Sequence, residues 1–158
     1  MKEILESLKK DDRYHGLSEG NQPLKVLVVD DDKFTRSHLG KILSEVGYEI
    51  CGFAVDGEEA VAKYSLLKPD LVTMDIQMPR MDGLEALERI RNVDPDANIV
   101  MVSAGKFEQY SALKLLKDSI RKGARDFIFK LVTNENLPRF LEVVKLAGQG
   151  ILREHPTR

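Results

Sequence analysis

Leu71-Val-Thr-Met-Asp-Ile-Gln-Met-Pro-Arg-Met-Asp-Gly83 is the stretch of sequence around which the rest of the chain is organised. A short apolar run that favours a β-strand ends on Asp75, a Pro and a Gly then interrupt the chain, and helical spacing of apolar residues begins at Leu84. In a parallel α/β sheet this pattern places Asp75 at the carboxyl end of a buried strand, where such folds bind their ligands. Because a carboxylate there is poorly solvated, we expect a cationic partner to lie close to it.

Four similar units surround this one. Each joins a strand-like run to a segment with helical spacing, and Gly47 and Gly123 are placed to end two of the helices. The predicted strands span residues 25–30, 48–55, 71–75, 98–103 and 126–130, and the predicted helices follow as segments through 39–46, 58–67, 84–90, 107–122 and 137–147. Five consecutive βα units predict a doubly wound, five-stranded parallel sheet of the flavodoxin-like kind, with strand order 2-1-3-4-5 and helices on both faces.

The flanking segments carry no chemical signal. Residues 1–23 predict an N-terminal extension with one marginal helix and a linker, residues 24–148 form the α/β domain, and residues 149–158 form a C-terminal tail.

A net charge of −2 without a basic stripe argues against a nucleic-acid partner. A single cysteine, a charged N-terminus and the lack of a long apolar run predict a cytoplasmic protein with no membrane partner.

The predicted ligand crevice lies between the ends of strands 1 and 3, which carry Asp30-Asp31-Asp32 and Asp75. Asp residues at such turns commonly cap helices, and Asp32 fits that role best. Several carboxylates in one crevice raise the pKa of at least one of them unless a cation intervenes. Clustered oxygen ligands with positions left for water suit Mg²⁺.

Two further strand ends add a hydroxyl and an ammonium group. Ser103 closes strand 4, and Lys130 closes strand 5 at the same edge as the Asp cluster. A lysine at a strand end is often only a solvated residue that protects a sheet edge. A carboxylate nucleophile, Mg²⁺, a hydroxyl and an ammonium group are nevertheless the parts that phosphoryl transfer needs.

Four stretches together resemble the CheY-type receiver domain of response regulators: residues 26–36 (VLVVDDDKFTR), 70–83 (DLVTMDIQMPRMDG), 102–104 (VSA) and 123–130 (GARDFIFK). The resemblance covers about residues 25–147 and involves all five strands in order. It implies that Asp75 accepts a phosphoryl group from a histidine kinase. It further implies that Asp31 ligates Mg²⁺ directly, that Asp30 helps through water, and that Asp75 and the backbone carbonyl of Gln77 complete the metal site.

The same resemblance assigns a switch. Ser103 would hydrogen-bond the phosphoryl group, Lys130 would pair with it, and Phe127 would occupy the aromatic position whose rotamer reports the switch. The chain departs from the family in two places, since Leu131 stands where a proline usually follows the lysine, and the segment between Ser103 and Gly123 is several residues longer than usual. We expect the Lys130–Leu131 bond to be trans because a cis bond before a non-proline residue costs about 2.5–4 kcal/mol.

The sequence therefore predicts a stand-alone response regulator, which is a phosphoacceptor switch that assists its own phosphorylation and dephosphorylation rather than a conventional enzyme. A protein target or phosphatase would bind the face formed by residues 107–122, 126–130 and 137–147, and the setting would be chemotaxis. Two alternatives remain open, an intermediate of a phosphorelay and a haloacid-dehalogenase-type phosphatase using Asp30. A flavodoxin-like FMN carrier would share the fold. The phosphatase pattern expects a hydroxyl residue where Phe34 stands, and three aspartates would repel the FMN phosphate.

Overall fold

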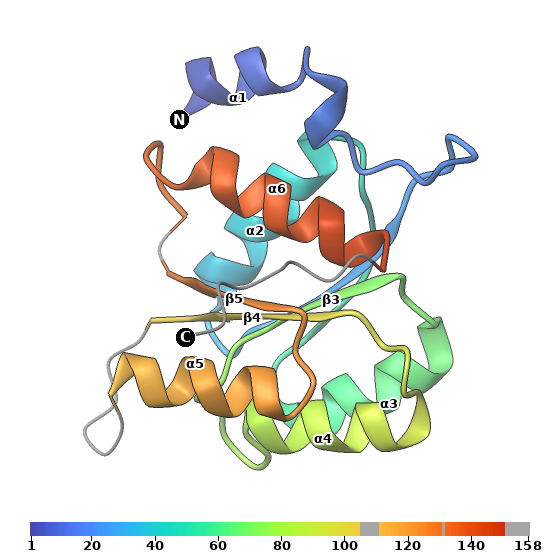
Figure 1. Cartoon of the computed structure of the whole chain (residues 1–158), viewed down its shortest axis with the longest axis vertical. Coiled ribbons are helices and arrows are strands. Elements are labelled where there is room, and N and C mark those ends of the chain that lie inside the picture. The colour runs from blue at the N-terminus through green and yellow to red at the C-terminus, as the bar shows by residue number, and fades with distance from the viewer. Residues whose placement is uncertain (105–110, 131, 151–158) are drawn as a thin grey trace.

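The computed structural model of the chain describes residues 1–104, 111–130 and 132–150. Two short N-terminal helical segments precede five alternating strands and helices (Figure 1). The helical elements are α1 (Lys2–Leu8), the 3₁₀ turn η1 (Asp12–Tyr14), α2 (Lys33–Glu45), α3 (Gly57–Leu67), α4 (Gly83–Val93), α5 (Ala112–Arg121) and α6 (Leu137–Gly148). The strands are β1 (Lys25–Val29), β2 (Glu49–Ala54), β3 (Leu71–Met74), β4 (Ile99–Ser103) and β5 (Asp126–Phe129). Within the described residues, no helix combines the length and the apolar character needed to cross a membrane.

All five strands pair in parallel in the order β2-β1-β3-β4-β5, which confirms the predicted topology. Val29 of β1 aligns with Met74 of β3, so both strands end at the same level and Asp30 and Asp75 leave the sheet side by side. On the β5 side of the sheet, Ser103 of β4 aligns with Phe129 of β5, and Lys130 follows Phe129 directly. The register of the sheet therefore places the predicted site residues along one edge.

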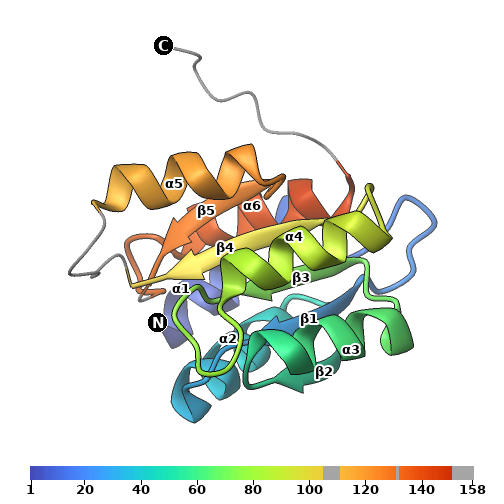
Figure 2. The same ribbon diagram turned by 90° about the horizontal axis from the view of Figure 1, so that it is seen from below.

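Two layers of helices bury the two faces of the sheet (Figure 2). Side chains alternate along β1: Val26 and Val28 join the core beneath α2 and α6, whereas Leu27 and Val29 join the core beneath α3, α4 and α5. Because the central strands are buried on both faces, they read as the continuous apolar runs noted in the sequence.

The N-terminal extension packs on the α2/α6 layer (Figure 1). Leu5 is 7% exposed within that core, and the ammonium group of Lys145 on α6 donates hydrogen bonds to the carbonyls of His15 and Leu17. The backbone N–H of Gly16 donates to the carbonyl of Val46 at 2.8 Å, directly after α2. Residues 1–23 are thus folded onto the α/β domain along much of their length.

Most element boundaries agree with the sequence prediction to within a few residues, but two helix starts differ more. The first helix begins at Lys33, earlier than the segment 39–46 marked by apolar spacing, because Asp32 caps it. The fourth helix was expected from residue 107, but α5 begins at Ala112, because Ser111 has an extended backbone and its hydroxyl caps the helix by accepting from the N–H of Lys114. The expected start and the Lys130–Leu131 bond both involve residues outside the described ranges.

Candidate functional site

Three carboxylates converge where β1 and β3 end. Oxygen atoms of Asp30, Asp31 and Asp75 all lie within 4.8 Å of one another. Asp30 and Asp75 are 1% and 5% exposed, whereas Asp31 is exposed to solvent. The backbone holds both buried residues, since the N–H of Asp30 donates to Ala54 and that of Asp75 donates to Val29. The parallel register of β1, β2 and β3 thus fixes the carboxylates side by side.

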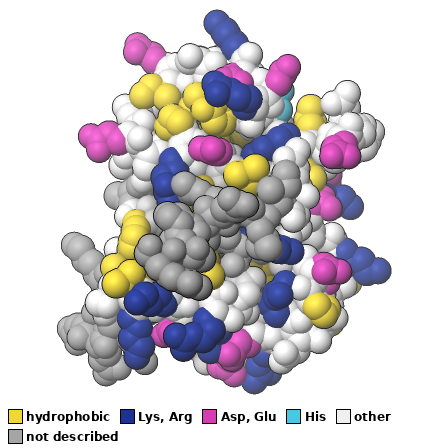
Figure 3. Space-filling view, in the orientation of Figure 1, with side chains coloured by type: hydrophobic (Ala, Val, Ile, Leu, Met, Phe, Trp, Pro, Cys, Tyr) yellow, Lys and Arg dark blue, Asp and Glu magenta, His cyan; other side chains and the backbone are white. Residues whose placement is uncertain are grey.

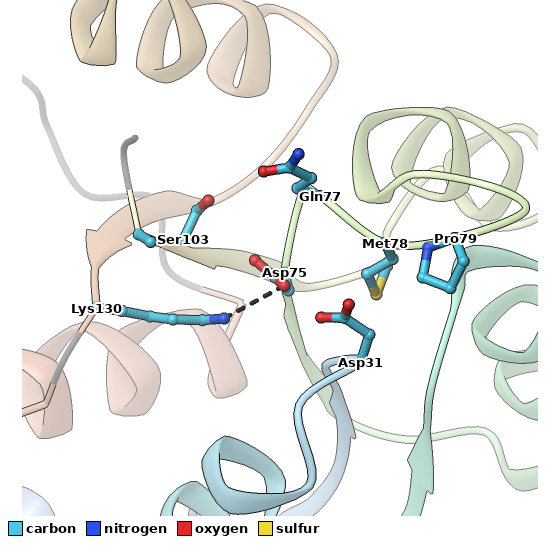
Figure 4. Close-up of a pocket in the computed structure, with 8 residues that line it drawn as sticks. Asp31, Asp75, Gln77, Met78, Pro79, Ser103 and Lys130 are labelled. Atoms are coloured by element: carbon cyan, nitrogen blue, oxygen red, sulfur yellow. Dashed lines mark ion pairs between the residues drawn. The ribbon is translucent and has the colours of Figure 1, made fainter. Parts of the chain in front are cut away.

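Lys130 bridges the two buried carboxylates. Its Nζ lies 2.5 Å from Oδ2 of Asp30 and 3.2 Å from Oδ2 of Asp75. In Figure 4 the lysine side chain extends across the pocket to Asp75, and the Asp31 carboxylate faces Asp75 from the loop after β1. The cationic partner expected for Asp75 is therefore the ammonium group of Lys130.

The electrostatics of the cluster follow from burial and close charge. Burial, together with the negative charge of Asp30, raises the pKa of Asp75 to about 7, although Lys130 opposes this increase. Burial likewise raises the pKa of Asp30 against the opposing effect of Lys130. For Lys130, burial alone would lower the pKa, but its hydrogen bond with Asp30 and the charge of Asp75 outweigh burial and raise it. The ammonium group of Lys130 thus stays charged. The two carboxylates keep raised pKa values beside it, so a further cation would stabilise their ionised forms.

Ser103 contributes a buried hydroxyl at the same pocket. The residue is 1% exposed, and among the described residues its Oγ has no hydrogen-bond partner. A buried hydroxyl without a hydrogen-bond partner lowers the stability of the folded state by about 1–3 kcal/mol. A ligand that forms a hydrogen bond with this hydroxyl would therefore be bound more tightly. The backbone N–H of Lys130 donates to the carbonyl of Ser103 at 2.8 Å, which ties together the ends of β4 and β5.

The pocket above these groups has a volume of about 490 Å³. Its lining consists of Asp31, Asp75, Gln77, Met78, Pro79, Ser103, Ala104 and Lys130 (Figure 4). Of the residues singled out from the sequence, Phe127 lies outside this lining. It belongs to β5, is 3% exposed in the hydrophobic core, and its ring centroid is 4.9 Å from that of Phe129. Asp32 caps α2 by accepting from the N–H of Thr35 at 2.8 Å, as its position in the sequence suggested.

Some supporting residues had no individual signal in the sequence. The guanidinium of Arg36 donates to the carbonyl of Asp30 at 2.8 Å, which anchors the start of the carboxylate loop from α2. In the loop that follows β3, next to the pocket residue Pro79, Arg80 pairs with the buried Asp56. Asp56 stands where a helix cap is expected at the start of α3, but its partner 24 residues later could not be found without the fold.

Comparison with known proteins agrees with this geometry. Residues 26–142 match the family described as the response regulator receiver domain. The chemotaxis protein CheY of Thermotoga maritima is 45% identical over 106 residues, which cover 67% of this chain and 84% of that protein. CheY of Treponema pallidum is 42% identical over 134 residues, covering 82% and 89%.

The fold has solved counterparts as well. The crystal structure of a CheX–CheY–BeF₃–Mg complex from Borrelia burgdorferi superimposes with a TM-score of 0.72 and 38% identity, over 80% of this chain and 93% of that one. The response regulator domain of CheB from Thermotoga maritima gives a TM-score of 0.69 and 39% identity, covering 80% and 97%.

Proposed function

Because the chain belongs to the response regulator receiver domain family and is of the CheY type, we propose that Asp75 accepts a phosphoryl group from a histidine kinase in a Mg²⁺-dependent reaction. An oxygen of Asp75 attacks the phosphorus of the phosphohistidine, the N–P bond breaks, and an acyl phosphate forms on Asp75 while the imidazole leaves. One observation carries this proposal: a buried carboxylate, an ammonium group and an unpartnered buried hydroxyl meet at a single pocket.

The donor set of the pocket fits Mg²⁺. Three carboxylates offer oxygens within 4.8 Å of one another, with Asp31 open to solvent so that water can complete the coordination. Asp31 and Asp75 would hold the metal directly, Asp30 through water, and Gln77 through its backbone carbonyl. When bound, Mg²⁺ supplies positive charge that stabilises the oxygens of the transferring phosphoryl group. It would also favour the ionised form of Asp75, which is the nucleophile.

Lys130 and Ser103 act on the phosphoryl group once it has arrived. Lys130 already contacts Asp75, so its ammonium group can pair with a phosphoryl oxygen after a small movement. The hydroxyl of Ser103, which has no hydrogen-bond partner among the described residues, can donate a hydrogen bond to a second phosphoryl oxygen. These residues stand at the ends of β4 and β5. Drawing them toward the phosphoryl group therefore favours one of two arrangements of α5, β5 and α6, and the rotamer of Phe127 on β5 would report which one is adopted.

The surface beside these elements fits a protein partner. Leu113 of α5 and Phe129 of β5 are 58% and 43% exposed. Side chains of Lys and Arg gather over α5 (Figure 3). We infer that a protein target or phosphatase with apolar and acidic side chains binds this face more tightly after phosphorylation, as part of chemotaxis signalling in the cytoplasm. The chain then works as a switch that assists its own phosphorylation and dephosphorylation.

Intact-mass analysis after treatment with acetyl phosphate and MgCl₂ tests the acceptor. The wild type and the control Asp96→Ala, which removes an exposed carboxylate elsewhere, should each gain one phosphoryl group. Asp75→Ala, or the wild type with a chelator, should gain none. Modification that persists in Asp75→Ala or without divalent metal would overturn the assignment.

Amide hydrogen exchange tests the output face. Protection of residues 111–130 should differ between the phosphorylated and free forms, because α5 and β5 adjoin Ser103 and Lys130. A change restricted to the surroundings of Asp30 and Asp75 would show that the switch does not use this face.

A further inference from the structure

We propose that the ion pair between Asp56 and Arg80 is a clamp that positions the loop of residues 77–82, and thereby sets the affinity of the Asp75 site for Mg²⁺. The inference rests on the proposed function, because it concerns the metal that phosphoryl transfer to Asp75 requires. Neither residue touches the reacting atoms, so both are positioning residues.

The clamp joins an exposed side chain to a buried one. Nε of Arg80 donates to Oδ2 of Asp56 at 2.7 Å, and a terminal guanidinium nitrogen contacts the same oxygen. Asp56 is 2% exposed, and its other oxygen accepts from the N–H of Glu59 at 2.8 Å, which caps α3. The hydrogen bond from Glu59, with the charge of Arg80 adding to it, holds the pKa of Asp56 below its usual value. A buried, ionised carboxylate fixed to α3 is thus a rigid anchor for the loop.

A second contact beside the ion pair points to the same role. The backbone N–H of Gly57 donates to the carbonyl of Met81 at 2.8 Å, next in the chain to Arg80. The loop approaches α3 so closely here that a Cβ at Gly57 would lie 2.5 Å from the Met81 oxygen. Since the Met81 side chain is itself buried, the loop has little freedom at this point while both contacts hold.

The loop so fixed forms one wall of the pocket. Gln77, Met78 and Pro79 line it, and Gln77 would give its backbone carbonyl to the metal. The base of the loop is closed independently, because the N–H of Gly83 donates to the carbonyl of Ile76 at 2.7 Å. Between this base and the contacts with α3, the position of the loop depends on the clamp. Partners that orient a metal ligand indirectly typically change metal affinity by about 10–100-fold when they are lost.

The backbone of Arg80 provides a way to separate positioning from general stability. Its φ is +64°, in the left-handed region that a glycine adopts more readily than an arginine. Arg80→Gly therefore removes the ion pair and relieves the backbone, whereas Arg80→Ala removes the ion pair and keeps the unfavourable φ. The glycine variant should be the more stable of the two, yet both should have lost the clamp.

Isothermal titration calorimetry of the unphosphorylated full chain with MgCl₂ is the direct test, with urea denaturation of each variant alongside. Arg80→Ala and Arg80→Gly should both bind Mg²⁺ about tenfold more weakly than the wild type. Arg80→Lys, which keeps a cation, should recover part of the loss. The control Arg89→Ala removes an exposed ion pair with Glu85 on α4 and the same unit of charge, and should leave the affinity within about twofold.

A merely structural role would make Mg²⁺ affinity follow stability, so Arg80→Gly would bind better than Arg80→Ala. That result, or wild-type affinity in Arg80→Gly, would overturn the clamp while phosphorylation of wild-type Asp75 stays intact. If the wild type itself binds no Mg²⁺ and gains no phosphoryl group on Asp75, the proposed function fails and the clamp fails with it.

Discussion

Replacing Asp75 by Asn should stabilise the metal-free protein at pH 8. The side chain is 5% exposed, and burial together with the charge of Asp30 raises its pKa from 3.8 to about 7. The ionised carboxylate is therefore disfavoured in the folded state. This pKa shift of about three units corresponds to a loss of about 4 kcal/mol in the free energy of unfolding when Asp75 is ionised, since each pKa unit is worth about 1.4 kcal/mol. Lys130 loses one of its two partners in the variant, so we expect a net gain of about 2–4 kcal/mol.

The direction of the pH dependence follows from proton linkage. Between about pH 4 and pH 7 the folded state of the wild type binds a proton at Asp75 that the unfolded state has released. The free energy of unfolding therefore falls as the pH rises through this window, and the fall is complete above the folded-state pKa. Asp75→Asn lacks this proton, so its stability should fall less over the same range.

Urea denaturation in the presence of a chelator, at pH 5 and pH 8, measures both quantities. The wild type and Asp75→Asn should converge toward pH 5 and separate at pH 8. Asp96→Asn, at an exposed site, should track the wild type at both pH values. Equal stability of the wild type and Asp75→Asn at pH 8 would refute the claim that the carboxylates repel one another in a buried site.

Three further predictions concern the same site. Asp31→Asn should stabilise the metal-free protein and abolish the rise in melting temperature that MgCl₂ gives the wild type, since that rise depends on metal occupancy of the folded state; unchanged melting in both tests would mean that the carboxylates do not share a site. Lys130→Gln should destabilise the metal-free protein by about 3–5 kcal/mol because it leaves Asp30 and Asp75 buried without their cation, and MgCl₂ should restore part of the loss; a melting curve equal to the wild type would contradict this. Gly83→Ala should cost about 3 kcal/mol or more in urea denaturation, because the new Cβ would lie 1.9 Å from the carbonyl oxygen of Asp75, and a near-neutral effect would contradict the close approach.

The sheet and the main site groups could be predicted because their signals are local. Apolar runs ending on Asp30, Asp75, Ser103 and Lys130 mark strand ends, and parallel strands bring such ends to one edge. The structure places these residues together, with Lys130 between Asp30 and Asp75. The match of residues 26–142 to the response regulator receiver domain favours that reading over the phosphatase alternative, which needed Asp30 as its nucleophile.

What the sequence could not supply are contacts between distant segments. The pairing of Asp56 with Arg80 depends on the start of α3 lying beside the loop after β3, and neither residue signals the other. The start of α5 was misplaced because helical spacing of apolar residues reaches back to Phe107, while the serine cap at Ser111 decides the boundary. The packing of residues 1–23 was missed for the same reason, since Leu5 and Leu8 look marginal until α2 and α6 are placed beneath them.

The packing of the extension has a consequence for the order of events during synthesis. The carbonyl of His15 accepts a hydrogen bond from the ammonium group of Lys145, which lies 130 residues later in the chain. His15 is therefore synthesised well before its partner. At roughly 5–20 residues per second, this interval lasts roughly 7–26 s. The hydrophobic cluster that buries Leu5 lacks its α6 residues for all of that time. The segment around His15 is therefore made well before α6 but can reach its final position only after α6 has formed.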